Sequence, residues 1–540
     1  MRAPLRIGST RHPRLLQIDA RTWTARLSAS AGRRKTLGDI RAADIDPLAE
    51  LGFDLVWLTG VWTIGTGSRR LWRGSEALRD QRRQVLPDGS DDDIVGSPYA
   101  IAAYEPADSL GGATGLATLR QRLGEAGIGL ILDFVPNHVA VDHPWVRRNP
   151  GWFVHPDADQ RAADPDAYFE VRSDGRHWIA HGRDPNYPPW TDTAQLDYRH
   201  PAVPRAMAQA LREIATRCDG VVCSMAMLVL DDIFRTTWSG RSVAPAVAED
   251  ASPFGEFWWH ATSAVHDAYP KFLLIGEAYW GQEYRLQQLG FNYTWDKPLL
   301  ERLLDGDARS VAAHLRADDT YQRRSLRLLE DRAGPRIAAQ MTPDHERAAA
   351  LVEATLPGML LIRDGQIQGA RADVPIQLRR EPDEAPDHAL HDFYCRLLRA
   401  TDDEAFRTGH AIRLEPLAAW DGNATHEGIV ARLWVGQHRQ LRLSVANLTG
   451  EPAQAYIPLA LPEFNGKTVR LEDQLDEIEY VRSGDDLLTR GLYVDLPGYG
   501  RHLFRITRES VPGRRRSGSN GRSGSNGHAD QPSGASSSRA

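Results

Sequence analysis

The stretch Gly129-Leu-Ile-Leu-Asp133-Phe-Val-Pro-Asn137-His138 joins a short apolar run to a group of polar side chains. Residues 54–59, 220–230 and 271–277 repeat this pattern, each with a run rich in Val, Ile, Leu or Trp that ends in polar residues. Helix-like segments separate these runs. Nearly continuous apolar strands that alternate with helices indicate a parallel sheet covered on both faces.

Further segments bring this pattern close to a full barrel. Residues 15–19, 326–329 and 358–362 are additional strand candidates, and the amphipathic segments 117–126 and 204–217 are expected to be covering helices. The number of strands then approaches the eight of a (β/α)8 TIM barrel. In such a barrel the loops that follow the strands build the active site.

Changes in composition and in hydrophobic pattern divide the chain into several regions. We assign residues 1–400 to the barrel, with an inserted subdomain at 139–198 that is rich in Pro, Asp, Trp and His. Short alternating segments predict an antiparallel β-sandwich domain at 405–508. Residues 511–540 contain two Ser-Gly-Ser-Asn-Gly repeats that cannot bury apolar surface, so we expect a disordered tail.

Composition excludes several classes of protein. The 540 residues carry 65 basic and 72 acidic side chains, a formal charge of −7, so no global positive field is available to bind nucleic acid. Three cysteines are too few for a disulfide framework or a zinc site built on cysteines. We find no run of about 20 apolar residues that would span a membrane, and arginines interrupt residues 1–16 where a secretory signal would be apolar. We therefore expect a cytoplasmic protein that contacts neither membrane nor nucleic acid.

Polar residues that follow the third and fifth predicted strands are candidates for a site. Asp133, Asn137 and His138 can all hydrogen-bond sugar hydroxyls, although the same residues could simply cap the strand and its loop. Glu277 ends an apolar run and precedes the aromatic pair Tyr279-Trp280. Desolvation by such neighbours raises the pKa of a carboxyl group, as a general acid requires.

At this point the sequence resembles glycoside hydrolase family 13, the α-amylase family. The resemblance extends over about residues 15–505 and rests on landmarks that occur in the family's order. They are Gly96-Ser-Pro-Tyr-Ala-Ile-Ala-Ala-Tyr104, residues 133–138, Thr193-Ala-Gln-Leu-Asp197, Asp219-Gly220, Gly276-Glu277, Pro335-Arg336, and Pro357-Gly358 followed by Gly365-Gln366.

The resemblance implies both an architecture and an activity. It implies a (β/α)8 barrel, an insertion after the third strand, a C-terminal β-sandwich and a retaining mechanism on α-glucosidic bonds with two carboxylates. Glu277 would be the acid/base, and an α-linked gluco-oligosaccharide would contact Tyr104, Asp133, Asn137, His138, Trp280 and Arg336. No organic cofactor is expected, some members hold structural calcium, and the resemblance indicates no particular protein partner.

Two of the family's catalytic positions depart from its pattern. Aligned on Asp219-Gly220, the family's arginine is Val222 and its nucleophilic aspartate is Ser224. Aligned on Pro335-Arg336, the third carboxylate is Ala333. Loss of a catalytic nucleophile costs on the order of 10⁴–10⁶ in rate. We therefore expect a catalytically impaired protein that retains an α-glucan cleft.

Two alternatives remain open. In the first, the protein is an active retaining glycosidase or glucosyltransferase in which a nearby carboxylate replaces the missing ones. Glu330 and Asp331 lie close to the position of Ala333, and Asp231 and Asp232 lie beyond Ser224. In the second, the protein is a structural or regulatory subunit whose cleft has lost its use. Sugar binding without turnover distinguishes the impaired protein from both alternatives.

Overall fold

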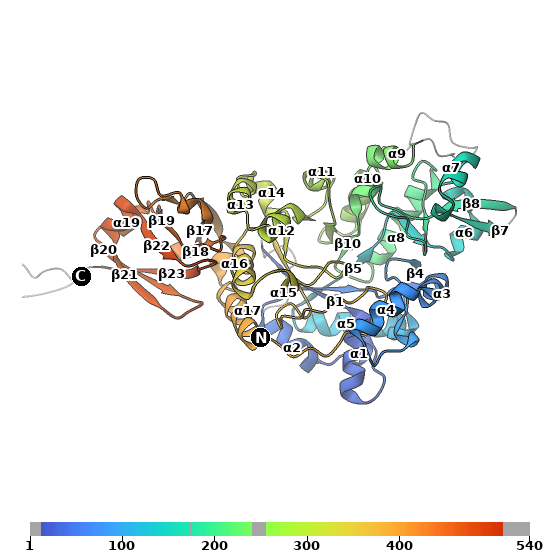
Figure 1. Ribbon diagram of the computed structural model, residues 1–540, viewed down its shortest axis with the longest axis horizontal. Coiled ribbons are helices and arrows are strands. Elements are labelled where there is room, and N and C mark those ends of the chain that lie inside the picture. The colour runs from blue at the N-terminus through green and yellow to red at the C-terminus, as the bar shows by residue number, and fades with distance from the viewer. Residues whose placement is uncertain (1–11, 173–174, 240–254, 511–540) are drawn as a thin grey trace, which may run out of the picture.

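The structure is a computed structural model that describes residues 12–172, 175–239 and 255–510. Eight parallel strands close into a barrel in the order β1-β14-β13-β12-β11-β10-β5-β2 (Figure 1). This confirms the predicted fold class. The predicted disordered tail at 511–540 lies outside the described residues. The barrel strands are β1 (Arg14–Asp19), β2 (Leu55–Thr59), β5 (Gly129–Phe134), β10 (Gly220–Cys223), β11 (Leu273–Gly276), β12 (Tyr293–Trp295), β13 (Ser325–Leu328) and β14 (Met359–Arg363).

Apolar side chains fill the inside of the barrel. The cluster contains residues from every strand, so the barrel is a packed core rather than a pore. Val222 of β10 is fully buried in it. The buried members of this cluster are Leu15, Leu55, Trp57, Ile131, Val222, Ile275, Trp295, Leu326, Leu328, Met359 and Leu361.

Helices cover the outside of the barrel, as the amphipathic segments predicted. In α8 (Ala202–Ala215) the buried residues Val203, Met207, Leu211 and Ile214 recur every three or four positions and so form one apolar face. The other long barrel helices are α1 (Ala20–Ala31), α2 (Ala42–Glu50), α5 (Gly112–Glu125), α10 (Phe257–Ala268), α12 (Lys297–Leu304), α16 (Pro343–Ala354) and α17 (His388–Ala400). Short helices α9 (Asp231–Thr237), α11 (Glu283–Gln288), α13 (Ala308–His314), α14 (Asp319–Arg323), α15 (Ile337–Gln340) and α18 (Glu404–Thr408) lie in the connections.

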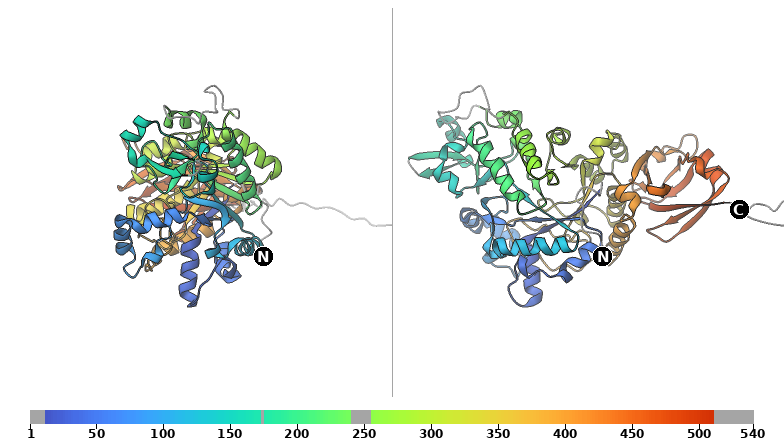
Figure 2. Two further views of the ribbon diagram at one scale, coloured as in Figure 1. Left: turned by 90° about the vertical axis from the view of Figure 1, so that its right-hand side faces the viewer. Right: turned by 180° about the vertical axis from the view of Figure 1, so that it is seen from behind.

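Two excursions from the barrel stand at one end of the molecule, opposite the C-terminal domain (Figures 1 and 2). Between β2 and β5 the chain forms β3 (Trp62–Ile64), α3 (Thr66–Gly74), α4 (Glu76–Val85) and β4 (Ile101–Pro106). Between β5 and β10 it forms β6 (His138–Ala140), α6 (Pro144–Arg148), α7 (Ala158–Ala163), β7 (Tyr168–Arg172), β8 (Arg176–Ala180) and β9 (Thr193–Gln195). Antiparallel pairing of β6 with β9 ties the two ends of the second excursion together.

The C-terminal domain consists of two antiparallel sheets with a shared apolar core. Trp434 joins this domain to the barrel, because its indole N–H donates to the carbonyl oxygen of Thr355 at 2.8 Å and its ring packs against Phe406. The larger sheet contains β15 (His410–Leu414), β17 (Ile429–Val435), β18 (Leu441–Asn447), β23 (Arg501–Ser510), β20 (Lys467–Asp473) and β21 (Glu479–Ser483). The smaller contains β16 (Leu417–Ala418), β19 (Ala453–Ile457) and β22 (Leu492–Leu496), and α19 (Gly484–Arg490) lies between β21 and β22.

Within the described ranges, no helix has the length and apolar character needed to cross a bilayer. α5, with 14 residues, is among the longest described helices and carries Arg120, Arg122 and Glu125.

Candidate active site

Glu277 stands at the carboxyl end of the fifth barrel strand, where it follows β11 directly. Its backbone continues the parallel ladder with β10, since its N–H donates to the carbonyl oxygen of Cys223 at 3.0 Å. Its own carbonyl oxygen accepts from the N–H of Ala226 at 2.9 Å. Cys223 and Gly276 are partners in register at the ends of β10 and β11. Ser224 and Glu277 are therefore the first residues after these two adjacent strands.

Two hydrogen bonds orient the Glu277 carboxyl group. Oε2 accepts from the backbone N–H of Met225 at 2.9 Å, and Oε1 accepts from the Tyr279 hydroxyl at 2.9 Å. Met225 has a φ of 45°, a left-handed conformation that is uncommon for a side chain of this size. This conformation accompanies the N–H group that faces the carboxyl group. Backbone strain of this kind is stored at functional sites.

The environment of Glu277 suits a general acid. Burial raises the pKa of Glu277 to about 7, and the negative charge of Asp331 adds to the effect. The hydrogen bonds from Met225 and Tyr279 oppose this rise in pKa and are outweighed. A carboxylic acid with a pKa near neutrality can protonate a leaving group and later accept the proton back.

Replacement of Glu277 by glutamine is expected to raise the free energy of unfolding near pH 8 and to change it little near pH 4.5. The raised pKa means that the stabilising contribution of the protonated acid is complete below 4.5 and is lost as the pH rises through about 7. At about 1.36 kcal/mol per pKa unit, the difference at pH 8 amounts to roughly 3 kcal/mol. Urea unfolding of both proteins across this range measures it. If the free energies of unfolding of the two proteins changed with pH in parallel, the pKa of Glu277 would not be raised in the folded protein.

The end of the fourth barrel strand carries no carboxylate. Ser224 follows β10, is 8% exposed and donates its backbone N–H to the carbonyl oxygen of Phe134 at 2.9 Å. No histidine or carboxylate among the described residues hydrogen-bonds its hydroxyl group. A serine without such a base is a weak nucleophile. Two positions earlier, Val222 is part of the apolar barrel core.

The loop after β13 brings a different carboxylate into the site. Asp331 Oδ1 accepts from the backbone N–H groups of Ala333 at 2.8 Å and Gly334 at 3.0 Å. Its Oδ2 lies 3.9 Å from Nζ of Lys297. The charge of Asp331 raises the pKa values of Glu277 and Tyr279, so these three groups share one electrostatic environment. Ala333 lies on the exposed side of the turn that Asp331 caps.

The structure places the other proposed substitute carboxylates away from Glu277. Glu330 accepts from Nη1 of Arg336 at 2.9 Å and from the backbone of Ile337 at 2.6 Å. Both partners of this ion pair are buried, so the expected sugar contact of Arg336 has no exposed group to make it. Asp231 and Asp232 belong to α9 and form ion pairs with arginine side chains, Asp231 with Arg235 and Asp232 with Arg285.

Asp133 lies in β5, Asn137 in the loop that follows it, and His138 at the start of β6. Asp133 is completely buried, accepts from Nε1 of Trp57 at 2.9 Å and from Gly60 N at 2.8 Å, and has its pKa raised by burial to about 7. The Asn137 amide donates to Oε1 of Gln195 at 3.1 Å. Burial lowers the pKa of His138 to about 4. The internal bonds of Asp133 and Asn137 favour positioning roles over direct contact with a sugar.

Two tyrosines of the Gly96–Tyr104 landmark have different places. The Tyr104 hydroxyl donates to the carbonyl oxygen of Val135 and accepts from its N–H, both at 3.0 Å, so it fixes the loop after β5. Tyr99 lies closer to the acidic groups. Burial raises its pKa well above 10, and the charges of Asp133, Glu277 and Asp331 contribute. Tyr99 belongs to the same landmark as Tyr104, but no pattern in the sequence distinguishes it as the tyrosine on which the acidic groups act.

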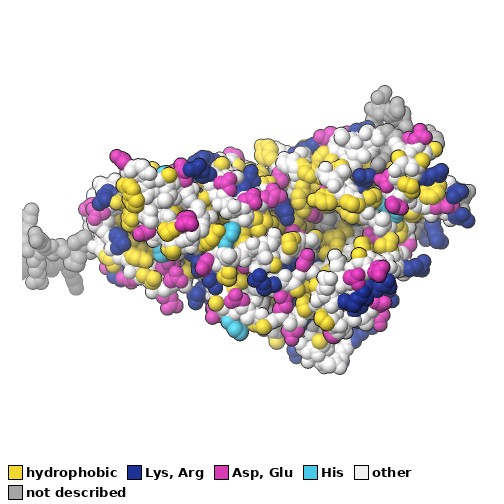
Figure 3. Space-filling view, in the orientation of Figure 1, with side chains coloured by type: hydrophobic (Ala, Val, Ile, Leu, Met, Phe, Trp, Pro, Cys, Tyr) yellow, Lys and Arg dark blue, Asp and Glu magenta, His cyan; other side chains and the backbone are white. Residues whose placement is uncertain are grey.

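Trp280 offers an aromatic surface beside the acid. It lies three residues beyond Glu277, is 44% exposed and has a φ of 60°. Figure 3 shows a hollow bordered by hydrophobic side chains over the region where Figure 1 places β5 and β10. A left-handed φ is uncommon for a side chain of this size, and the ring exposes an apolar face to water. Among the described residues, no group of three or more His, Cys, Asp or Glu side chains is arranged to hold a metal ion.

The fold and the site together define the class of protein. The molecule is a (β/α)8 barrel with a half-buried carboxyl group directly after its fifth strand and with small sheets inserted after its second and third strands. The family described as "Alpha amylase, catalytic domain" matches residues 25–296, about half of the chain. The chain belongs to the α-amylase family.

Relatives match a shorter part of the chain. Alpha-1,4-glucan:maltose-1-phosphate maltosyltransferase 1 of Streptomyces coelicolor is 32% identical over 165 residues, which is 26% of this chain and 22% of that protein. The maltosyltransferase of Bifidobacterium longum is 33% identical over 137 residues, 24% of this chain and 17% of its own length. The matches thus span about a fifth of these relatives.

Solved structures match the whole described fold. A maltogenic α-amylase of Thermotoga neapolitana is similar with a TM-score of 0.62 at 17% identity, over 93% of this chain and 99% of that one. An α-amylase of Geobacillus thermoleovorans, in a complex with acarbose, has a TM-score of 0.60 at 16% identity over 92% and 98% of the two chains. At these identities the likeness establishes the fold.

Proposed function

We propose that this protein binds α-linked gluco-oligosaccharides in the cleft beside Glu277 and hydrolyses them little or not at all. The observation that carries the proposal is the end of β10, where Ser224 stands in place of a carboxylate next to the acid on β11. A retaining mechanism needs two carboxyl groups about 5–5.5 Å apart, one to attack the sugar and one to move the proton. The acid is present, and the position of the nucleophile carries a neutral hydroxyl group.

At the end of β10 this chain lacks both a positive and a negative side chain of the family pattern. The family pattern has an arginine two residues before the aspartate, and this chain has Val222 and Ser224 at those two positions. Loss of one member of a buried ion pair is strongly destabilising, whereas replacement of both by well-packed neutral groups is close to neutral. Val222 packs inside the barrel with no exposed surface. The strand therefore supports a stable barrel that lacks the catalytic charge.

Sugar binding is supported by groups that remain around the acid. The charges of Asp133, Glu277 and Asp331 act on Tyr99, and Trp280, in the loop after β11, is 44% exposed. Aromatic faces pack against the apolar faces of sugar rings, while carboxyl groups accept from their hydroxyls. Isothermal titration of acarbose tests this half of the proposal, and absence of binding by the folded protein would instead favour a structural or regulatory subunit.

A second candidate function has one specific observation in its favour. Asp331 lies close enough to Glu277 to raise its pKa, so the site does contain two carboxyl groups. In this alternative the protein is a glycosidase or glucosyltransferase that uses Asp331, and the similarity to maltosyltransferases is consistent with transfer. Two backbone N–H groups donate to Oδ1 of Asp331, and Nζ of Lys297 lies 3.9 Å from Oδ2. Sugar release that disappears in Asp331→Asn would establish this alternative.

Replacement of Trp280 by glycine is expected to weaken binding and stabilise the fold. Loss of the ring removes about 1 kcal/mol or more of stacking, a factor of roughly 5–10 in the affinity for acarbose. Glycine adopts the φ of 60° without strain, which should add about 1 kcal/mol to the free energy of unfolding. Calorimetric titration and urea unfolding measure the two effects.

The matched control for this experiment is Trp420→Ala in the C-terminal domain. Trp420 is 55% exposed and lies outside the barrel, so its removal should leave the acarbose affinity unchanged. If Trp280→Gly bound acarbose as tightly as the unaltered protein, Trp280 would have no part in the sugar site.

A further inference from the structure

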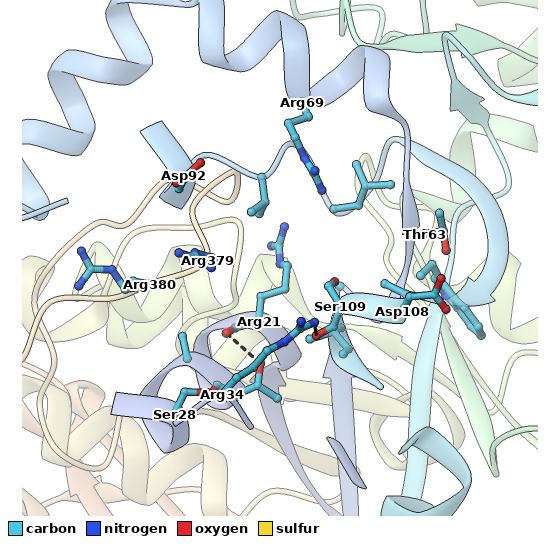
Figure 4. Close-up of a pocket in the computed structure, with 18 of the residues that line it drawn as sticks. Arg21, Ser28, Arg34, Thr63, Arg69, Asp92, Asp108, Ser109, Arg379 and Arg380 are labelled. Atoms are coloured by element: carbon cyan, nitrogen blue, oxygen red, sulfur yellow. Dashed lines mark hydrogen bonds between the residues drawn. The ribbon is translucent and has the colours of Figure 1, made fainter. Parts of the chain in front are cut away.

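A large cavity lies beside the segments that follow β1 and β2, and Glu277 does not line it. It has a volume of about 910 Å³, is open to solvent on one side and is lined by residues of α1, β3, α3 and the segment around Arg379 (Figure 4). Seven Arg or Lys side chains line it, against two carboxylates, Asp92 and Asp108. This local excess of positive charge occurs in a chain whose net charge is −7.

Some of the cationic side chains are held by carboxylates. Arg21 is buried and bonded to Asp19, with Nη2 at 2.8 Å from Oδ2. Arg73 pairs with Asp92 at 3.0 Å. Arg380 pairs with Asp93 and points away from the cavity in Figure 4. These pairs build the frame of the cavity and leave their charges largely neutralised.

Other cationic groups have no carboxylate of their own. Arg69 is exposed, and no described residue accepts a hydrogen bond from its side chain. Arg34 donates only to a neutral acceptor, the carbonyl oxygen of Ser109 at 2.9 Å. Arg379 shares the carboxylate of Asp93 with a second arginine. Figure 4 shows Arg69 and Arg21 extending toward each other from opposite sides of the cavity.

From this arrangement we infer a binding site for a phosphate-bearing ligand of the size of a phosphorylated sugar. Guanidinium groups are suited to phosphate oxygens, which they bind through paired, charge-assisted hydrogen bonds. The volume far exceeds that of one phosphate group and lies in the range of small-molecule pockets. Ala25, Ile64 and Val95 supply apolar lining next to the cationic groups. Such a lining fits the carbon skeleton of a ligand whose charge is bound by Arg34 and Arg69.

The cavity shares a wall with the site around Glu277 but does not contain it. Gly60 and Trp62 line the cavity, and they donate to Asp133, Gly60 N to Oδ2 at 2.8 Å and Trp62 Nε1 to the carbonyl oxygen at 2.8 Å. The inference is therefore independent of the proposed sugar cleft. A ligand here would be recognised by its phosphate, whereas acarbose in the cleft has no phosphate.

Isothermal titration with glucose 6-phosphate, inorganic phosphate and glucose tests the inference. We expect glucose 6-phosphate to bind in the cavity and glucose not to bind there. The affinity for glucose 6-phosphate should fall as salt is added. Arg34→Gln with Arg69→Gln should weaken binding at least about tenfold, because two charge-assisted contacts are removed. If inorganic phosphate bound as tightly as glucose 6-phosphate, the cavity would be an anion site for free phosphate, and the sugar part of the inference would be wrong.

Matched variants separate this site from its surroundings and from the cleft. Arg70→Gln removes an exposed arginine from the same helix that does not line the cavity, and it should leave binding unchanged. Trp280→Gly alters the cleft alone and should also have no effect. If glucose 6-phosphate did not bind the folded protein, or bound the double variant as tightly as the unaltered one, the inference would be wrong.

Discussion

Val222→Arg, Ser224→Asp and Ala333→Asp, made together, are expected to raise the rate of sugar release by on the order of 10²–10⁴-fold. A missing nucleophile costs on the order of 10⁴–10⁶. A restored nucleophile that lies about 1 Å from the best position recovers about 10²-fold less of that rate. Glu277 already has the raised pKa of a general acid, so it needs no change. Reducing-sugar assays on maltoheptaose measure the gain.

The three substitutions have to be combined for an electrostatic reason. Val222 lies inside the apolar barrel core, and an arginine there without a partner would be a buried, unpaired charge. Ser224→Asp supplies a carboxylate two residues away, and Ala333→Asp adds another from the exposed turn after β13. Glu277→Gln in the triple variant should abolish the gain. A folded triple variant without any gain would show that the cleft differs from the family beyond these positions.

Asp19→Asn is expected to lower the free energy of unfolding by about 3–5 kcal/mol. Asp19 ends β1 and accepts from two buried arginines, Arg21 at 2.8 Å and Arg332 at 3.2 Å. Asparagine keeps an oxygen that can cap α1, where Asp19 accepts from the N–H of Arg21 at 2.9 Å. The substitution therefore removes the charge and leaves two buried guanidinium groups without it. Urea unfolding near neutral pH measures the loss.

The pH dependence of this effect has a defined sign. Burial alone would raise the pKa of Asp19, but Arg21 and Arg332 outweigh it and lower the pKa to about 2. The stabilising contribution of Asp19 is therefore present above its unfolded value near 3.8 and is lost as the pH falls through about 2. Asp364→Asn is the control, because its pair with Arg26 is partly exposed and should contribute less than about 1 kcal/mol. Equal effects of the two substitutions would contradict the buried role of Asp19.

The barrel could be predicted because apolar strands and amphipathic helices are local patterns. β12 was missed, since three residues are too few to show a pattern. The predicted strand at 220–230 ends at Cys223, because the left-handed Met225 turns the chain into the short 3₁₀ helix Ala226–Val229. The backbone conformation and the close packing at Gly358, in the Pro-Gly landmark, require a glycine at this position. Its φ is 118°, and a Cβ there would lie 2.2 Å from the carbonyl oxygen of Ser325.

The site was only partly accessible from the sequence. Glu277 could be found because it directly follows an apolar strand and precedes aromatic residues. The hydrogen bond from Met225, the electrostatic effect of Asp331 on Glu277 and the burial of Arg336 arise when separate strands meet in the barrel. Nothing in the neighbouring residues specifies these contacts. That Ser224 and Ala333 stand at the family's catalytic positions stays a prediction from the order of the family's landmarks in the sequence.

The measurement that tests the central claim most directly is reducing-sugar release from a panel of α-linked oligosaccharides by the unaltered protein, with Glu277→Gln beside it. The claim that Ser224 cannot replace a carboxylate predicts no release above that of the glutamine variant, from protein that is folded and binds acarbose. Release by the unaltered protein that disappears in Glu277→Gln would contradict the claim. It would direct attention to Asp331, the carboxylate that shares the environment of Glu277.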